Sequence, residues 1–367
     1  MRSLTKILVL TTFALAAATA VANAKKPRGY VETKIVSNLD SENPVLPDPV
    51  LKNPWGIAFI PGGPIWINDN GTGLSTLYTG DGTKVLLEVT IPPPSNDAGA
   101  TATPTGIVCN GNPLSFLITG NQITASALFI FATEDGTISA WNGNSGTSAQ
   151  LVKDETDPTN GAVYKGLAQG VSASKGILLY ATNFRSGHMD VFDANFALVA
   201  LGAPGGLPGS FADSKIPAGF APFGIANING DLMVTYAMQD SAKHDDVAGN
   251  GSGFVDVFTT DGNLIRRFAT RSHLNSPWGI VRAGFNFGTL SNDLLIGNFG
   301  DGEINAFNDS GKFVGQLDGT DGKPLKIDGL WGLSFGGAAA AGPDTLYFTA
   351  GLNDEADGLF GSLIPNQ

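Results

Sequence analysis

A short motif recurs six times along this chain of 367 residues. In each copy a glycine is followed by an aliphatic residue and preceded by a bulky or polar one, as in Pro54-Trp55-Gly56-Ile57. The six glycines lie 50 to 60 residues apart, and they are Gly56, Gly106, Gly166, Gly224, Gly279 and Gly332. A repeat of this length is typical of folds in which copies of one small unit pack against each other.

A second motif divides each copy into strands. In five copies a glycine opens a run that ends five residues later in an aromatic residue, as Gly73 does with Tyr78, and a turn rich in Gly, Asn or Asp follows. The pattern predicts four antiparallel strands per copy. In the first copy these strands cover residues 57–59, 65–68, 74–78 and 85–89, and in the third copy the fourth strand is expected at residues 198–201.

A single four-stranded sheet cannot bury both of its faces, but six sheets arranged in a ring can do so. We therefore predict an all-β protein with one domain over residues 25–367, a six-bladed β-propeller of four-stranded antiparallel blades. The motif glycines would let the innermost strands approach the crowded axis. The sixth copy lacks a fourth strand, and residues 30–36 alternate like a strand before the first copy. We expect this N-terminal strand to complete the last blade and close the ring.

The first 24 residues have the three parts of a secretory signal peptide. Arg2 and Lys6 precede an apolar stretch, and Ala22-Asn23-Ala24 provides the cleavage pattern. The apolar stretch is shorter than the roughly twenty residues that span a bilayer, so we expect cleavage rather than a membrane anchor. The mature protein would be secreted or periplasmic. Its single cysteine, Cys109, allows no internal disulfide.

The formal net charge of −12 disfavours binding to nucleic acid and to anionic membranes, and it suits cations. A closed ring needs no partner to cover its sheet edges, so we expect a monomer. The partner that remains is an extracytoplasmic ligand or protein whose identity the composition does not indicate.

The motifs resemble those of NHL-type propellers. More closely, residues 53–58, 243–258 and 357–361 are similar to an uncharacterised family of secreted bacterial propellers often found beside PEP-CTERM sorting signals. The resemblance covers nearly all of residues 25–367 and implies no established activity. The chain ends in Ile364-Pro365-Asn366-Gln367, without the Pro-Glu-Pro motif, apolar segment and basic residues of such a tail. We therefore expect a free rather than an anchored protein.

Propeller topology brings the start of each innermost strand and the loop between its second and third strands to one face, called the upper face below. Exposed aromatic and cationic side chains near the channel mouth on this face would anchor a ligand. The predicted ligand-binding residues are Trp55, Lys165, Arg185, Trp278, Trp331 and His244.

Polar loops on the same face offer oxygen ligands. Asn68, Asn183 and Asn298 each end a second strand, where they could cap turns or together hold a hard cation. His244 adjoins two acids in a long loop, which suits a metal, acid–base chemistry or a solvated insertion. The predicted metal ligands are Asn183, Asp245, Asp246, Asn298, Asp301 and Asp354. Ca²⁺ is the one cofactor that these oxygen atoms suggest, and the catalytic residues stay unassigned.

Two functions remain open at this point. A binding module would use the acidic upper face to hold its ligand, whereas a metal-dependent hydrolase of the lactonase or esterase kind would hold Ca²⁺ in the central channel. The chain has no His-x-x-x-His pair, no Gly-x-Ser-x-Gly elbow and no phosphate-binding loop of the Walker type. The lack of these motifs favours the binding module, but fold alone does not decide.

Overall fold

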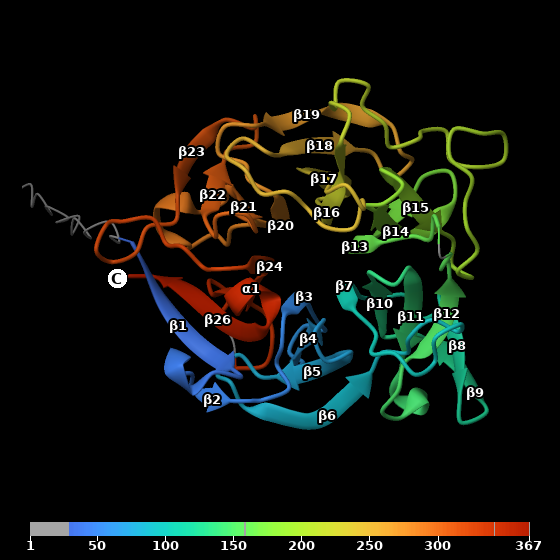
Figure 1. Cartoon of the computed structure of the whole chain (residues 1–367), viewed down its shortest axis with the longest axis horizontal. Coiled ribbons are helices and arrows are strands. Elements are labelled where there is room, and N and C mark those ends of the chain that lie inside the picture. Colours follow the sequence, from blue (N-terminus) through green and yellow to red (C-terminus); the bar gives the residue numbers. More distant parts are fainter. Residues whose placement is uncertain (1–28, 158, 341, 367) are drawn as a thin grey trace, which may run out of the picture.

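The computed structural model describes residues 29–157, 159–340 and 342–366. Its sheets form six blades around a central channel, which confirms the predicted all-β six-bladed propeller (Figure 1). The expected signal peptide, residues 1–24, lies outside the described residues, so its cleavage stays a prediction. Within the described ranges, no helix is long and apolar enough to cross a membrane.

Each blade runs from an innermost strand at the channel to an outer strand at the rim. The first blade contains β3 (Pro54–Phe59), β4 (Ile65–Asp69), β5 (Leu74–Tyr78) and β6 (Lys84–Thr90). The second contains β7 (Pro104–Cys109), β10 (Phe129–Thr133), β11 (Thr137–Trp141) and β12 (Gln150–Asp154), with an inserted hairpin of β8 (Leu117–Gly120) and β9 (Ile123–Ser126). The third contains β13 (Tyr164–Ser172), β14 (Gly176–Asn183) and β15 (His188–Phe192).

The second half of the chain repeats this order. The fourth blade contains β16 (Phe220–Ile228), β17 (Asp231–Met238), β18 (Phe254–Phe258) and β19 (Leu264–Thr270). The fifth contains β20 (Pro277–Arg282), β21 (Leu294–Asn298), β22 (Ile304–Phe307) and β23 (Phe313–Gln316). The sixth contains β24 (Leu330–Phe335), β25 (Leu346–Gly351), β26 (Asp357–Pro365), β1 (Tyr30–Ser37) and the short β2 (Leu46–Pro47). The helical pieces in the described ranges are α1 (Leu352–Glu355) and three 3-10 turns at Asp40–Glu42, Gly143–Ser145 and Gly288–Leu290.

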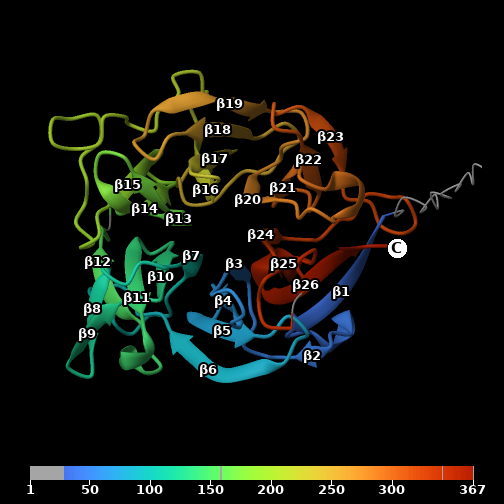
Figure 2. The same ribbon diagram turned by 180° about the vertical axis from the view of Figure 1, so that it is seen from behind.

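The N-terminal strand closes the ring, as predicted. β1 pairs antiparallel with β26, from Tyr30 opposite Pro365 to Ser37 opposite Leu359, and the two strands lie side by side in both views (Figures 1 and 2). The Ser37 hydroxyl also donates a hydrogen bond of 2.7 Å to the Gly358 carbonyl. The last blade is therefore built from the two ends of the described chain.

The third blade departs from the prediction at its outer edge. The strand expected at residues 198–201 is reduced to two isolated bridges, between Phe192 and Leu198 and between Leu201 and Leu207. Gly202 then donates its N–H to the Leu207 carbonyl at 2.9 Å. The chain turns away here because the following Ala-Pro-Gly-Gly segment favours a turn and cannot continue the ladder.

The motif glycines allow neighbouring blades to touch, backbone to backbone. A Cβ placed on Gly56, Gly224 or Gly332 would lie 2.5, 2.1 or 2.4 Å from the carbonyl oxygen of Thr105, Trp278 or Trp55, respectively. Two of these carbonyls also accept side-chain bonds from second strands: Thr349 Oγ1 donates to the Trp55 carbonyl at 2.5 Å, and Asn68 Nδ2 donates to the Thr105 carbonyl at 3.0 Å. Any side chain at these glycines would force the inner strands apart.

We predict that Gly224→Ala destabilises the protein by about 1–3 kcal/mol, the usual cost of forcing extra atoms into a packed interior. The added methyl would collide with the Trp278 carbonyl. Chemical denaturation of both proteins measures the difference. Gly143→Ala is the control, because a Cβ at that exposed glycine meets no atom within 4 Å. Equal effects of the two substitutions would contradict the packing argument.

Candidate functional site

The upper end of the channel is plugged by the residues that precede the motif glycines. These residues are Trp55, Thr105, Lys165, Phe223, Trp278 and Trp331, and all six are buried. The rings of Trp55 and Trp331 stack with centroids 3.5 Å apart, and Trp278 meets both rings edge-on at 5.9 and 5.8 Å. The expectation of exposed tryptophans was therefore wrong, because these rings pack on one another. Their predicted role in ligand binding stays a prediction.

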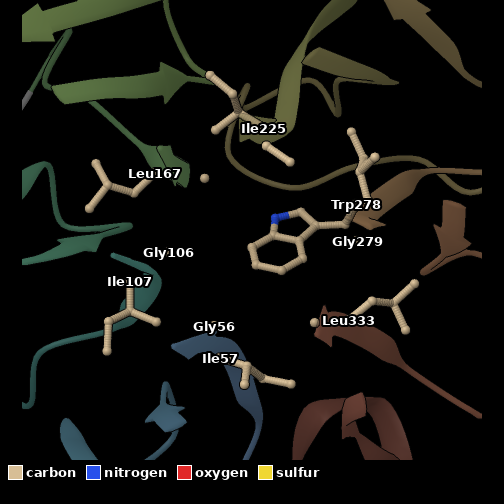
Figure 3. Close-up of a pocket in the computed structure, with 13 residues that line it drawn as sticks. Gly56, Ile57, Gly106, Ile107, Leu167, Ile225, Trp278, Gly279 and Leu333 are labelled. Atoms are coloured by element: carbon tan, nitrogen blue, oxygen red, sulfur yellow. The ribbon is translucent and has the colours of Figure 1, made fainter. Parts of the chain in front are cut away.

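Below this plug lies a cavity of about 150 Å³ on the channel axis. The aliphatic residues that follow the motif glycines line it from all six blades, and the Trp278 ring extends across it (Figure 3). The lining residues labelled in the figure include Ile57, Ile107, Leu167 and Leu333. The aromatic plug thus separates this cavity from the upper mouth.

A second set of residues surrounds the plug from above. Each of them follows the second-strand residue that pairs with the residue two positions before the motif glycine. The set is Asn70, Glu134, Phe184, Ala237, Phe299 and Gly351. Phe184 packs against Phe223, and Phe299 stacks on Trp331 with centroids 4.0 Å apart. The members of this set from the third to fifth blades, Phe184, Ala237 and Phe299, are therefore apolar, whereas Asn70 and Glu134 from the first two blades are polar.

The polar side of the mouth centres on a buried lysine. Lys165 forms an ion pair with Glu134, and its Nζ lies 3.2 Å from Asp245 Oδ1. The Lys165 side chain is only 2% exposed, and its Nζ stands 5.2 Å from the Trp55 ring centroid. Burial alone would lower the pKa of this lysine, but the carboxylates of Glu134 and Asp245 outweigh burial and raise it. Lys165 therefore stays an ammonium ion, in contact with two acids and an aromatic face.

Amides connect this ion pair to the first and sixth blades. Asn70 Nδ2 donates to Glu134 Oε2 at 2.8 Å, and Asn53 Nδ2 donates to Glu355 Oε2 at 2.6 Å. Asn53 Nδ2 also lies 3.3 Å from Asn70 Oδ1, and its own Oδ1 accepts the Trp331 Nε1–H at 3.1 Å. We call the connected side chains the mouth cluster: Asn53, Asn70, Glu134, Lys165, His244, Asp245 and Glu355.

The long loop between β17 and β18 brings His244 and Asp245 to the mouth cluster. A bridge between Gln239 and Asp246 closes the base of this loop, and Asp240 Oδ1 accepts the backbone N–H of His244 at 2.8 Å. Farther along, Gly249 N–H donates to Asn275 Oδ1 of the fifth blade at 2.7 Å. The loop therefore reaches across the upper face from the third blade to the fifth.

Two groups of the cluster have pKa values that matter near neutral pH. Burial raises the pKa of Glu355 to about 7, although the hydrogen bond from Asn53 opposes this effect. The pKa of His244 is raised because its Nδ1 bonds Asp245 Oδ1 at 2.9 Å, and the same bond lowers the pKa of Asp245. A carboxyl group that titrates near pH 7 can exchange protons with a bound ligand.

Metal-ligating atoms do converge at one point of the cluster. One atom from each of Glu134, His244 and Asp245 lies within 4.8 Å of the other two. Lys165 bonds both carboxylates of this group, so a metal ion would have to displace its ammonium group. The negative charge of these residues suits a cation, but the ammonium group of Lys165 already occupies that role.

The other predicted metal ligands do not join this group. Asn183 Nδ2 bonds Asp190 Oδ2 within its own blade, and Asn298 Nδ2 bonds the His273 carbonyl. Asp301 accepts a bond of 3.1 Å from Asn275, and Asp354 is exposed in α1. Asp246 lies next to the group in sequence, and burial raises its pKa. Only Asp245 of the six predicted ligands lies in the three-residue group.

Strand pairing also corrects the alignment of the three asparagines. Asn183 and Asn298 pair with the first residues of their innermost strands, but in the first blade Asp69 rather than Asn68 has this partner. Asn68 lies one residue earlier and donates its Nδ2 to the Thr105 carbonyl at 3.0 Å. The three side chains therefore occupy two different positions, and they do not form one set of ligands.

Glu134, Asn53, Asn70 and Glu355 were not among the predicted site residues. The sequence could have indicated two of them. Asn70 and Glu134 directly follow second strands, as Phe184 and Phe299 do, and this position places a residue at the channel mouth. Arg185, which was predicted, lies outside the cluster, where its Nη1 donates to the Gly161 carbonyl at 3.2 Å.

Two relatives of this chain come from Acanthamoeba polyphaga mimivirus. Uncharacterized protein R648 is 36% identical over 324 residues, which cover 87% of this chain and 76% of that protein. Uncharacterized protein L690 is 34% identical over 346 residues, which cover 93% of this chain and 88% of that protein. No protein-family model matches the chain. The expected bacterial family with PEP-CTERM signals therefore stays a prediction.

Solved structures share the fold at low sequence identity. A streptogramin B lyase superposes with a TM-score of 0.50 at 13% identity, over 91% of this chain and 97% of that one. A Thermus thermophilus protein described as a putative oxidoreductase (glucose dehydrogenase) gives 0.51 at 15% identity, over 92% and 100% of the two chains. At these identities the likeness shows the propeller fold alone.

We predict that Lys165→Met destabilises the protein by about 3–5 kcal/mol, because it leaves the Glu134 carboxylate without its buried partner. The double variant Lys165→Met with Glu134→Gln should recover most of this loss, since it removes both charges. Denaturant melts of the three proteins test the pairing. If the double variant is no more stable than Lys165→Met, the ion pair is not the cause.

The raised pKa of Glu355 predicts a pH dependence of stability. Between its ordinary value of 4.5 and about 7, the folded protein keeps a proton that the unfolded chain has released. Stability should therefore fall as the pH rises through this window, and Glu355→Gln should remove this part of the fall. Melting temperatures from pH 5 to 8 measure the effect. Asp231→Asn, at the exposed start of β17 on the opposite face, should leave the profile unchanged.

Proposed function

Because the chain belongs to the family that includes proteins R648 and L690 of Acanthamoeba polyphaga mimivirus, we propose a function from its own side chains. The protein is a binding module whose mouth cluster holds the cationic group of a ligand, such as an ammonium or guanidinium group. The observation that carries this proposal is the convergence of the carboxyl groups of Glu134, Asp245 and Glu355 around a single buried lysine.

The charges of the cluster support a cationic ligand. Lys165 neutralises only one of the two carboxylates that it contacts, and Glu355 adds a third acid above pH 7. Protonated His244 offsets part of this charge, but Asp245 already accepts its hydrogen bond. The net charge of −12 adds a long-range field that favours the approach of cations. The half-buried ring of Phe299, which stacks on the plug, offers apolar surface for the body of such a ligand.

We further propose that the module works outside the cytoplasm, as a monomer. Support comes from the three-part N-terminal segment and from a ring whose edges are closed by β1. The likeness to PEP-CTERM-associated propellers fits this location. Binding a partner protein through a lysine or arginine side chain would use the same chemistry as binding a small cation.

Titration of the purified protein with spermidine and with arginine tests the proposal by calorimetry. Binding should be saturable and should tighten several-fold from pH 6 to pH 8, because Glu355 becomes a carboxylate over that range. Glu355→Gln should weaken binding about tenfold at pH 8, the usual value of a charge-assisted hydrogen bond, and should remove the pH dependence. Asp231→Asn, a matched loss of one acid elsewhere, should bind like the parent.

A metal-dependent hydrolase remains the second candidate, and one observation favours it. Glu134, His244 and Asp245 converge closely enough to share an ion, and Glu355 titrates where a general base would. A lyase and a dehydrogenase-type protein share the fold, but fold does not select a reaction. Metal analysis and melting in chelator, followed by a panel of lactones and esters, decide this case. Protein without bound metal and without a chelator-induced shift would exclude the Ca²⁺ hydrolase.

A further inference from the structure

We propose that a hollow beside the mouth cluster binds an oxyanion, the phosphate, sulfate or carboxylate group of a small polar ligand. The hollow has a volume of about 590 Å³ and lies between the loops of the third and fourth blades. Two cationic side chains and four polar ones line it: Arg185, Lys243, Thr159, Asn160, Ser186 and Ser241. This site is separate from the cation site proposed above and does not depend on it.

The charge of the lining is opposite to that of the protein as a whole. Among the described residues, no acidic side chain lines the hollow, although the chain has 33 acidic and 21 basic residues. The nearest acids in sequence are Asp240 and Asp157, and loop backbone engages both. Asp240 Oδ1 accepts the backbone N–H of His244 at 2.8 Å, and Asp157 Oδ1 accepts those of Thr159 and Asn160 at 2.8 Å. The net negative charge of the protein would repel anions, so an anion would be attracted here only by the two cationic side chains of the hollow.

The walls of the hollow are fixed before any ligand arrives. Gln239 Nε2 donates to the Phe184 carbonyl at 2.5 Å, which ties the base of the fourth-blade loop to the third blade. Arg185 Nη1 donates to the Gly161 carbonyl, and Gly161 N–H closes the Asp157 turn at 2.9 Å. This bond holds the Arg185 guanidinium group beside the turn between Asp157 and Gly161, and its other N–H groups can donate to a ligand. Such preorganisation lowers the cost of binding.

The donors match the chemistry of an oxyanion. Arginine presents a planar fork of N–H groups that fits carboxylate, sulfate or phosphate oxygens, and lysine adds a point charge. The hydroxyl groups of Thr159 and Ser241 supply neutral donors around the same space. The Ser186 hydroxyl instead donates to the Asn183 carbonyl at 3.2 Å. The volume is in the range of small-molecule sites and exceeds what a bare ion fills, so we expect the anionic group to be part of a larger polar molecule.

Calorimetric titrations with inorganic sulfate, inorganic phosphate and glucuronate, in chloride buffer of constant ionic strength, test this site. At least one anion should bind saturably with one site per chain. Stronger binding of glucuronate would identify a carboxylate ligand, and stronger binding of the inorganic anions would identify a sulfate or phosphate ester. Spermidine carries no anionic group and glucuronate carries no cationic group, so these two titrations let either proposal fail alone.

Substitutions then place the bound anion in the hollow. Arg185→Gln should weaken binding about tenfold, the value of one charge-assisted hydrogen bond, and Lys243→Gln should weaken it by a smaller factor. Lys215→Gln, which removes an exposed charge outside the hollow, should bind like the parent. Circular dichroism and melting temperatures confirm that each variant is folded. Absence of saturable binding for all three anions, or an equal loss in Lys215→Gln, would overturn the proposal.

Discussion

The contact between each motif glycine and the backbone of the next blade sets the dimensions of this propeller. A hydrogen atom at Gly56, Gly224 and Gly332 leaves room for a carbonyl oxygen of the neighbouring innermost strand. The inner strands can then converge closely enough for three tryptophans to meet on the axis. Everything at the upper mouth depends on this convergence, because it brings side chains from six separate repeats within reach of one another.

The repeat fixes positions around the mouth, and the chemistry comes from where copies differ. Tryptophan or phenylalanine precedes the glycine in four copies, and these rings form the plug. The third copy has Lys165 at that place, and burial then requires acids from elsewhere to neutralise it. Glu134 and Asp245 meet this requirement from the neighbouring blades. A single departure from the repeat thus organises the polar half of the mouth.

Much of the fold could be predicted from the sequence, since glycine spacing, turn residues and strand alternation all carry local information. The six blades, the position of most strands and the closing role of residues 30–36 follow from those patterns. The mouth cluster could not be predicted in the same way. Lys165 and Asp245 lie 80 residues apart, and only the ring brings them together. Asn68 was aligned wrongly because residue type suggested a position that strand register assigns to Asp69.

The closing pair of strands has a consequence for how the chain reaches its folded state. Bonds between β1 and β26 join residues more than 300 positions apart, such as Ser37 and Gly358. Contacts of such long range form slowly, because most of the chain must be ordered before its ends can meet. Intermediate states would expose the edge of β26, a long strand with few charges that can pair with other chains. The same strand that completes the ring therefore also makes late folding the stage most exposed to aggregation.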